Sequence, residues 1–329
     1  MYNNIQKYYP RFLFFAKLII LAFAYRVISQ KIFGETSYIF FLEQLETLKA
    51  WAPWVAAFLF LMTGLNWLIE IFKWQLLARL IRPTSFGQAV KQSLSSLTVS
   101  LMTPNRIGEY GAKALYFERK DRSRVILFNF IGNFSQMSTT VLFGLLGFWW
   151  VYKSFPILDL EGVSWIKIGL LTSTLGVGLI LLSKMWKGFY SKLIRDLKSV
   201  PAKTHITVFA LSLLKYLVFS HQFYFLLVLF GVELGYLECM SLLGLSYLIS
   251  SLIPGFVLFD WLVKGSVAVA IFSRFGVDEM LVLSITSVMW LLNFGFPSLV
   301  GTLYVMAFKP VSASRRSRSE KQQKSMAQK

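Results

Sequence analysis

Ionisable side chains stand beside a proline in one otherwise apolar stretch of this sequence. Pro104 is followed by Arg106, Glu109 and Lys113. An acid and a lysine four residues later lie on one face of a helix, so Glu109 and Lys113 are predicted to form an ion pair. Arg106 has no such local partner. Its guanidinium, together with backbone amides freed at the proline, could hold a phosphate group. A guanidinium can bind two oxygens of one phosphate at once, and the N-terminus of a helix attracts anions.

A second stretch repeats this arrangement 150 residues later. Pro254 is followed by Asp260 and, after four more residues, by Lys264. Each proline also follows a serine-rich apolar segment. Ionisable residues are rare within apolar segments and usually functional, so both stretches are candidate binding sites. The structural alternative is that these charged residues, Arg106 included, only form ion pairs that allow the two stretches to insert into the membrane.

Other polar residues within apolar segments are candidates of a weaker kind. Asn133 and Asn293 are predicted to line a headgroup cavity, with hydrogen bonds between helices as the ordinary alternative. Glu70 and Lys73 are predicted to form a helix-end pair without a functional role. Lys215 is predicted to extend toward a membrane interface.

The composition identifies the surroundings that must position these residues. Of 329 residues, 56% are apolar and only 15% charged, which excludes a soluble enzyme and a disordered chain. A single cysteine and two histidines exclude a disulfide framework and a cysteine- or histidine-rich metal site. No metal and no other cofactor is expected.

Apolar runs of about 20 residues predict membrane-spanning helices. Two further stretches, 85–118 and 236–275, are each broken near the middle by a proline, and each predicts a hairpin of two short helices of re-entrant type. The fold class is therefore all-α, a polytopic membrane protein with six spanning helices and two broken hairpins. The six predicted spans are 10–30, 53–73, 125–151, 164–184, 206–231 and 280–308.

The basic residues orient this arrangement, because loops rich in lysine and arginine face the cytoplasm. Of the 34 lysines and arginines, 23 fall in segments on one side if both termini are cytoplasmic. We therefore predict a multi-pass protein of the bacterial inner membrane with both termini cytoplasmic. Three full spans separate the two hairpins, so they enter from opposite faces as an inverted repeat, which is a pointer to a midplane binding site.

The domain organisation follows from these elements. Residues 1–310 are predicted to form one transmembrane domain with half-repeats at about 85–151 and 236–308, and residues 311–329 a basic disordered tail. The tail is expected to lie on anionic lipid headgroups and not to bind nucleic acid. The oligomeric state is left open, with a homodimer as one alternative.

The first hairpin carries a resemblance to a known family. The run Pro104-Asn-Arg106-Ile-Gly108-Glu109 resembles the Pro-x-Arg-x-Gly-Glu signature of the lysylphosphatidylglycerol synthase transmembrane family. The resemblance extends from about Phe23 to Phe308, although Asp260 stands where many relatives carry a glutamate after a glycine-rich run. It implies a flippase-like membrane domain without the aminoacyl-transferase domain.

These lines of reasoning predict a protein that translocates or binds an anionic phospholipid or a lipid-linked headgroup between leaflets. The substrate-binding residues would be Pro104, Arg106, Glu109, Lys113, Asp260, Lys264, Asn133 and Asn293. No catalytic residue is assigned. An integral-membrane lipid-modifying transferase and a scaffold for lipid or envelope synthesis are the alternatives.

Overall fold

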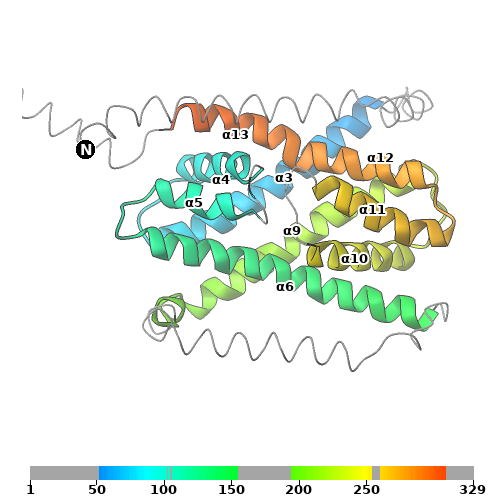
Figure 1. Ribbon diagram of the computed structural model, residues 1–329, viewed down its shortest axis with the longest axis horizontal. Coiled ribbons are helices and arrows are strands. Elements are labelled where there is room, and N and C mark those ends of the chain that lie inside the picture. Colours follow the sequence, from blue (N-terminus) through cyan, green and yellow to red (C-terminus); the bar gives the residue numbers. More distant parts are fainter. Residues whose placement is uncertain (1–51, 102, 104–105, 155–193, 254–259, 309–329) are drawn as a thin grey trace, which may run out of the picture.

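The computed structural model describes residues 52–101, 103, 106–154, 194–253 and 260–308. Every regular element within these ranges is a helix, which confirms the all-α fold class for them. In chain order (Figure 1) the elements are α3 (Ala52–Arg79), α4 (Phe86–Ser100), α5 (Ile107–Leu115), α6 (Arg122–Ser154), α9 (Ala202–Leu229), α10 (Tyr236–Leu252), α11 (Asp260–Phe272), η3 (Ser273–Phe275), α12 (Glu279–Trp290), η4 (Leu291–Gly295) and α13 (Phe296–Met306).

Three of the predicted spans correspond to helical stretches long and apolar enough to cross a membrane. These stretches are Pro53–Arg79, Ala202–Leu229 and Glu279–Met306. The predicted span 125–151 lies within α6, a continuous helix of 33 residues that is too polar to join this group. The predicted spans 10–30 and 164–184 and the tail 311–329 lie outside the described residues.

Both predicted broken hairpins are present as pairs of short helices. The first consists of α4 and α5, and the second of α10 and α11. Ser85 begins α4 with a capping box, in which its hydroxyl accepts from the Gln88 N–H and the Gln88 side chain accepts from the Ser85 N–H. The breaks themselves, at Pro104 and at residues 254–259, lie outside the described residues.

The last long helix changes its winding near the middle. Between α12 and α13, residues Leu291–Gly295 form a π-helical turn that ends two residues before Pro297. A proline lacks the backbone N–H and clashes with the preceding turn, so a wider turn lets the helix continue past it. The π turn also contains two residues of the site described below, Asn293 and Phe294.

The interior has two large apolar clusters with a polar zone between them. Along α3, Val55 and Leu59 belong to one cluster, and Ile71 and Trp74 to the other. The buried residues between them on α3 include Thr63, Asn66 and Glu70. The polar zone of this helix therefore lies between its two ends.

In two pairs of helices, a glycine of one helix lies directly against a backbone carbonyl of the other. On α13, a Cβ at Gly301 would collide with the Leu94 carbonyl oxygen of α4. On α6, a Cβ at Gly147 would collide with the Ser241 carbonyl oxygen of α10. The first helix of each hairpin thus lies close against a long helix from the other part of the chain. Small residues permit such close packing between membrane helices.

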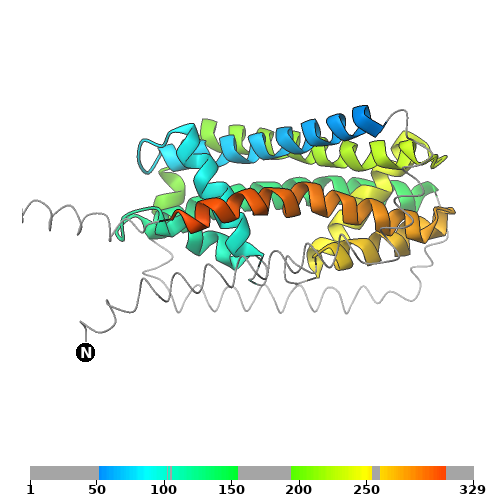
Figure 2. The ribbon, with the colours of Figure 1, turned by 90° about the horizontal axis from the view of Figure 1, so that it is seen from above.

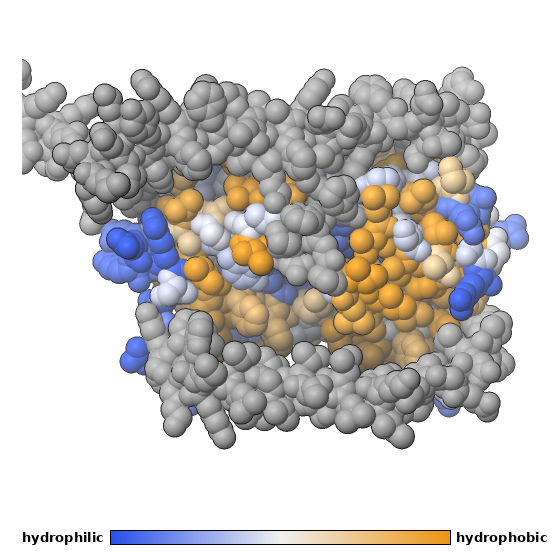
Figure 3. Space-filling view, in the orientation of Figure 1, coloured by the Kyte–Doolittle hydropathy of each residue, from blue (hydrophilic) through white to orange (hydrophobic). Residues whose placement is uncertain are grey.

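The two ends of the bundle are polar and the flanks are apolar. Figure 3 shows hydrophilic residues gathered at both ends with hydrophobic residues between them. Seen from above, α3 and α9 run side by side (Figure 2), in agreement with their extensive contacts. Exposed apolar side chains such as Phe60, Leu61, Leu145 and Leu303 cover the flanks, as a lipid-facing surface requires.

Candidate functional site

The helix ends next to the breaks of the two hairpins meet beside the π turn of the last long helix. Leu101, which follows α4, belongs to a small apolar cluster with Trp290, against which Trp261 of α11, Leu291 and Phe294 also pack. Figure 1 shows the two hairpins pointing toward each other across the middle of the molecule. The residues predicted from the two stretches are therefore brought to one place.

Arg106 begins α5 in an unusual backbone conformation. Its φ of 59° places it in the left-handed region, and it is the one non-glycine residue with positive φ among those described. Arg106 makes no side-chain cap. Instead, the Thr103 hydroxyl accepts a hydrogen bond of 2.8 Å from the Gly108 N–H. A Cβ at Gly108 would lie 2.7 Å from that hydroxyl oxygen, which accounts for the glycine of the signature.

Glu109 is held between two cations. Its Oε1 lies 2.8 Å from Lys113 Nζ, which confirms the predicted pair, and its Oε2 lies 2.9 Å from Arg106 Nη2. The expectation that Arg106 has no local partner is wrong, because the first turn of α5 brings residues three apart together. Glu109 is almost fully buried, whereas 36% of the Arg106 side chain is exposed. The guanidinium is therefore the accessible part of this triad.

Lys113 is fixed from three directions. Besides its bond to Glu109, its Nζ donates to Asn129 Oδ1 of α6 at 2.6 Å and lies 4.5 Å from the centroid of a Trp74 ring on α3. Only 2% of the side chain is exposed. The ammonium group thus connects α3, α5 and α6, and a structural contribution of this lysine is evident.

The second hairpin contributes a more open ion pair. Asp260 Oδ2 lies 2.7 Å from Lys264 Nζ, as predicted, with about a third of each side chain exposed. The Lys264 ammonium lies 5.2 Å from the centroid of the Phe294 ring, and the Arg106 guanidinium 6.0 Å from the same centroid. Asp260 is also close enough to Arg106 to interact with it electrostatically. One aromatic ring therefore stands beside both accessible cations.

A further set of charges, missed as functional from the sequence, lies deeper in the bundle. Glu70 Oε2 contacts Lys73 Nζ at 2.9 Å and Lys215 Nζ of α9 at 2.6 Å. The helix-end interpretation of Glu70 and Lys73 is wrong, because α3 continues to Arg79 and both residues are buried. Lys215 does not extend to an interface, since Glu70 holds it inside.

These inner and outer charges form one cluster. Glu70 interacts electrostatically with Lys113, Glu109 and Arg106. The charge cluster, as we call it below, comprises two acids and four bases: Glu70, Glu109, Lys73, Lys113, Lys215 and Arg106. Among the residues that the structure describes, this cluster therefore holds two more positive than negative charges, while Asp260 and Lys264 balance each other. An apolar surrounding makes such an excess costly unless an anion binds.

The two predicted asparagines occupy different positions. Asn133 of α6 donates a hydrogen bond of 3.1 Å to the hydroxyl of Tyr110, and Tyr110 follows Glu109 in the chain. Asn293 belongs to a buried network between helices, in which its side chain accepts from Asn66 at 2.8 Å and donates to Gln222 at 2.9 Å. Asn133 therefore lies at the edge of the charge cluster, whereas the bonds of Asn293 join α3, α9 and the π turn. Pro104 lies outside the described residues.

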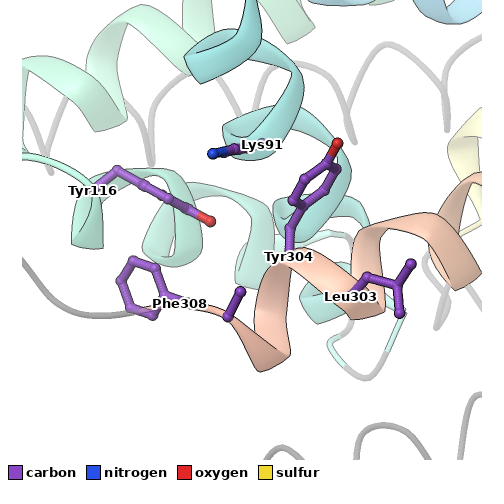
Figure 4. Close-up of a pocket in the computed structure, with 6 residues that line it drawn as sticks. Lys91, Tyr116, Leu303, Tyr304 and Phe308 are labelled. Atoms are coloured by element: carbon purple, nitrogen blue, oxygen red, sulfur yellow. The ribbon is translucent and has the colours of Figure 1, made fainter.

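A separate pocket of about 350 Å³ lies away from the charge cluster (Figure 4). The Tyr116 hydroxyl donates to Ser95 at 2.9 Å, and its ring packs 4.6 Å from that of Phe308. No member of the charge cluster lines this pocket, so it is not part of the site. Its lining residues are Lys91, Tyr116, Leu303, Tyr304, Ala307 and Phe308.

The chemistry available at the site is recognition of an anion by cations held in place by carboxylates. No group of three metal-ligating side chains occurs within the described ranges. Comparison with family models matches residues 18–301 to the model described as the lysylphosphatidylglycerol synthase TM region. No match was found among curated proteins or among solved structures.

Proposed function

Since this chain belongs to the lysylphosphatidylglycerol synthase TM region family, a membrane family with a lipid-related role, we propose that it binds an anionic phospholipid or lipid-linked headgroup and moves it between leaflets. The observation that carries this proposal is the excess of buried bases over acids in the charge cluster, with the Arg106 guanidinium partly exposed. A lipid phosphate would supply the missing negative charge.

The phosphate seat we propose lies between the two hairpins. Arg106 and Lys264 are the most exposed cations of the two ion-paired groups, and both stand beside Phe294. A guanidinium binds phosphate oxygens through two parallel N–H groups, which Glu109 occupies only at Nη2. The carboxylates of Glu109 and Asp260 hold the cations while no lipid is present, and an arriving phosphate exchanges with them.

We further propose that the two hairpins are halves of an inverted repeat, about 85–151 and 236–308. In support, α4 comes after the basic residues Arg79 and Arg82, whereas α10 comes after Glu233 and carries Glu238 in its first turn. Under the positive-inside rule, the first hairpin then enters from the cytoplasm and the second from outside, in a bacterial inner membrane. Both termini would be cytoplasmic.

A vesicle assay tests the proposed transport. The full chain is reconstituted into vesicles containing phosphatidylglycerol with a fluorescent headgroup label, and a membrane-impermeant quencher reports how much label faces outward over time. Wild type is expected to expose label from the inner leaflet. Arg106→Gly removes the guanidinium but suits the positive φ, so transport should be lost without loss of fold.

The control for this variant is Arg119→Ala, since Arg119 is an exposed arginine outside the charge cluster. It should transport at the wild-type rate. Unchanged transport in Arg106→Gly would refute the assignment of the phosphate seat. A change in lipid composition, in place of sidedness, in cells producing the protein would favour the lipid-modifying enzyme.

A further inference from the structure

Two buried donor groups at the inner side of the charge cluster have no hydrogen-bond acceptor among the described residues. They are Asn129 Nδ2 and Lys73 Nζ, whose ion pair with Glu70 lacks the geometry of a hydrogen bond. Both side chains belong to residues that are 2% exposed. A buried donor without an acceptor costs about 1–3 kcal/mol, so two of them in one region require an explanation.

The orientation of the Asn129 amide follows from its neighbour. Lysine has only donor hydrogens, so the Asn129 atom that bonds Lys113 Nζ at 2.6 Å has to be the oxygen. The amide nitrogen is then turned away from Lys113. Exchanging the two amide atoms would set donor against donor, so the amide takes this orientation and Nδ2 is left without an acceptor among the described residues.

Lys73 lies on the same side of α6 as Asn129. A Cβ at Gly132, one helical turn after Asn129, would lie 3.7 Å from Lys73 Cε. Lys73 Nζ is ion-paired with Glu70 Oε2 at 2.9 Å, but this oxygen also takes the shorter contact of 2.6 Å from Lys215. Glu70 therefore shares one carboxylate oxygen between two ammonium groups, and Lys73 retains donor hydrogens.

We infer that Lys73 Nζ and Asn129 Nδ2 form an inner anion site, distinct from the Arg106 seat, that binds an anionic phosphate oxygen. Lys215 and Lys113 surround it with positive charge. Water could accept from both donors, but the two uncompensated charges of the cluster favour an anion over a neutral molecule. The phosphate belongs to a lipid headgroup or to free inorganic phosphate, and the experiment separates these sources.

The test measures the thermal unfolding midpoint of the full chain in a neutral detergent with little background anion. Inorganic phosphate is added in one arm and a short-chain phosphatidylglycerol in the other. A ligand that binds only the folded state raises the midpoint with concentration, here by a few degrees. A rise in the first arm assigns free phosphate, and a rise in the second arm alone assigns a lipid headgroup.

Asn129→Asp is the decisive variant. Its carboxylate still accepts from Lys113 and presents a second oxygen where the amide nitrogen was. The variant should unfold at a higher midpoint than wild type without added anion, and its response to the anion should be lost. Lys73→Met should also lose the response, whereas Lys91→Met, which removes an exposed lysine, should keep it.

The Arg106→Gly variant separates this inference from the proposed function. If the inner anion site exists, the unfolding midpoint of Arg106→Gly still rises with added anion, even though this variant loses transport. If Arg106→Gly loses the response and Asn129→Asp keeps it, the anion binds at Arg106 alone and the inner site is refuted. Absence of any response in wild type, in either arm, would also refute it.

Discussion

Replacement of Lys113 by methionine tests whether the charge cluster holds the fold together. The variant keeps the length of the side chain but removes the contacts of Nζ with Glu109 at 2.8 Å, Asn129 at 2.6 Å and the Trp74 ring at 4.5 Å. Glu109, only 3% exposed, is left with Arg106 as its partner. Removing one member of a buried pair costs about 3–5 kcal/mol. Because Arg106 still pairs with Glu109, we expect the lower end, about 3 kcal/mol.

Detergent-driven unfolding in mixed micelles, followed by circular dichroism, gives the change in free energy of unfolding. Lys120→Met is the control, because Lys120 is 76% exposed and 3.3 Å from Glu118. An exposed pair contributes less than about 1 kcal/mol. Combining Glu109→Gln with Lys113→Met should recover part of the loss, since no buried carboxylate that has lost one of its two cations then remains. Equal losses for Lys113→Met and Lys120→Met would refute the reasoning.

Three further predictions use other parts of the structure. Gly301→Ala should lower the free energy of unfolding by about 1–3 kcal/mol through collision with α4, whereas Gly64→Ala, with open space around it, should raise it by about 0.5–1 kcal/mol. Asn293→Leu should cost about 1–3 kcal/mol in the same assay, because its amide partners on α3 and α9 lose their bonds. After the native cysteine is replaced by serine, a cysteine at Lys120 should be labelled only from the cytoplasm and one at Asp278 only from outside. Labelling of either from the opposite side would refute the orientation.

Local spacing in the sequence was sufficient to predict the hairpins and two of their ion pairs. Glu109 with Lys113, and Asp260 with Lys264, are four residues apart on one helix, so a helix alone brings them together. The pair of Arg106 with Glu109 was missed, although a spacing of three residues could have revealed it. The break at the proline concealed where α5 begins.

Contacts between helices distant in the chain could not be predicted from one sequence. Lys215 reaches Glu70 across 145 residues, and Asn293 reaches Asn66 across 227. Which face of each helix points inward decides these pairs, and an apolar helix surrounded by lipid has little amphipathic pattern to reveal that face. Phe294, beside both accessible cations, is an ordinary apolar residue in the sequence and gave no signal.

The close backbone approaches limit which parts of this protein can move. With α4 seated on α13 at Gly301 and α10 seated on α6 at Gly147, each hairpin is coupled mechanically to a long helix from the other part of the chain. Neither half can rotate as a rigid body without dragging one arm of the opposite hairpin. On α5, by contrast, Gly111 has open space around it, and on α11 Gly265 faces the side chains of Leu283 and Thr286. These two arms, which begin after Arg106 and at Asp260, are held to the neighbouring long helices by side chains, as Lys113 shows for α5, and a side chain can change its rotamer where two backbones in contact cannot separate.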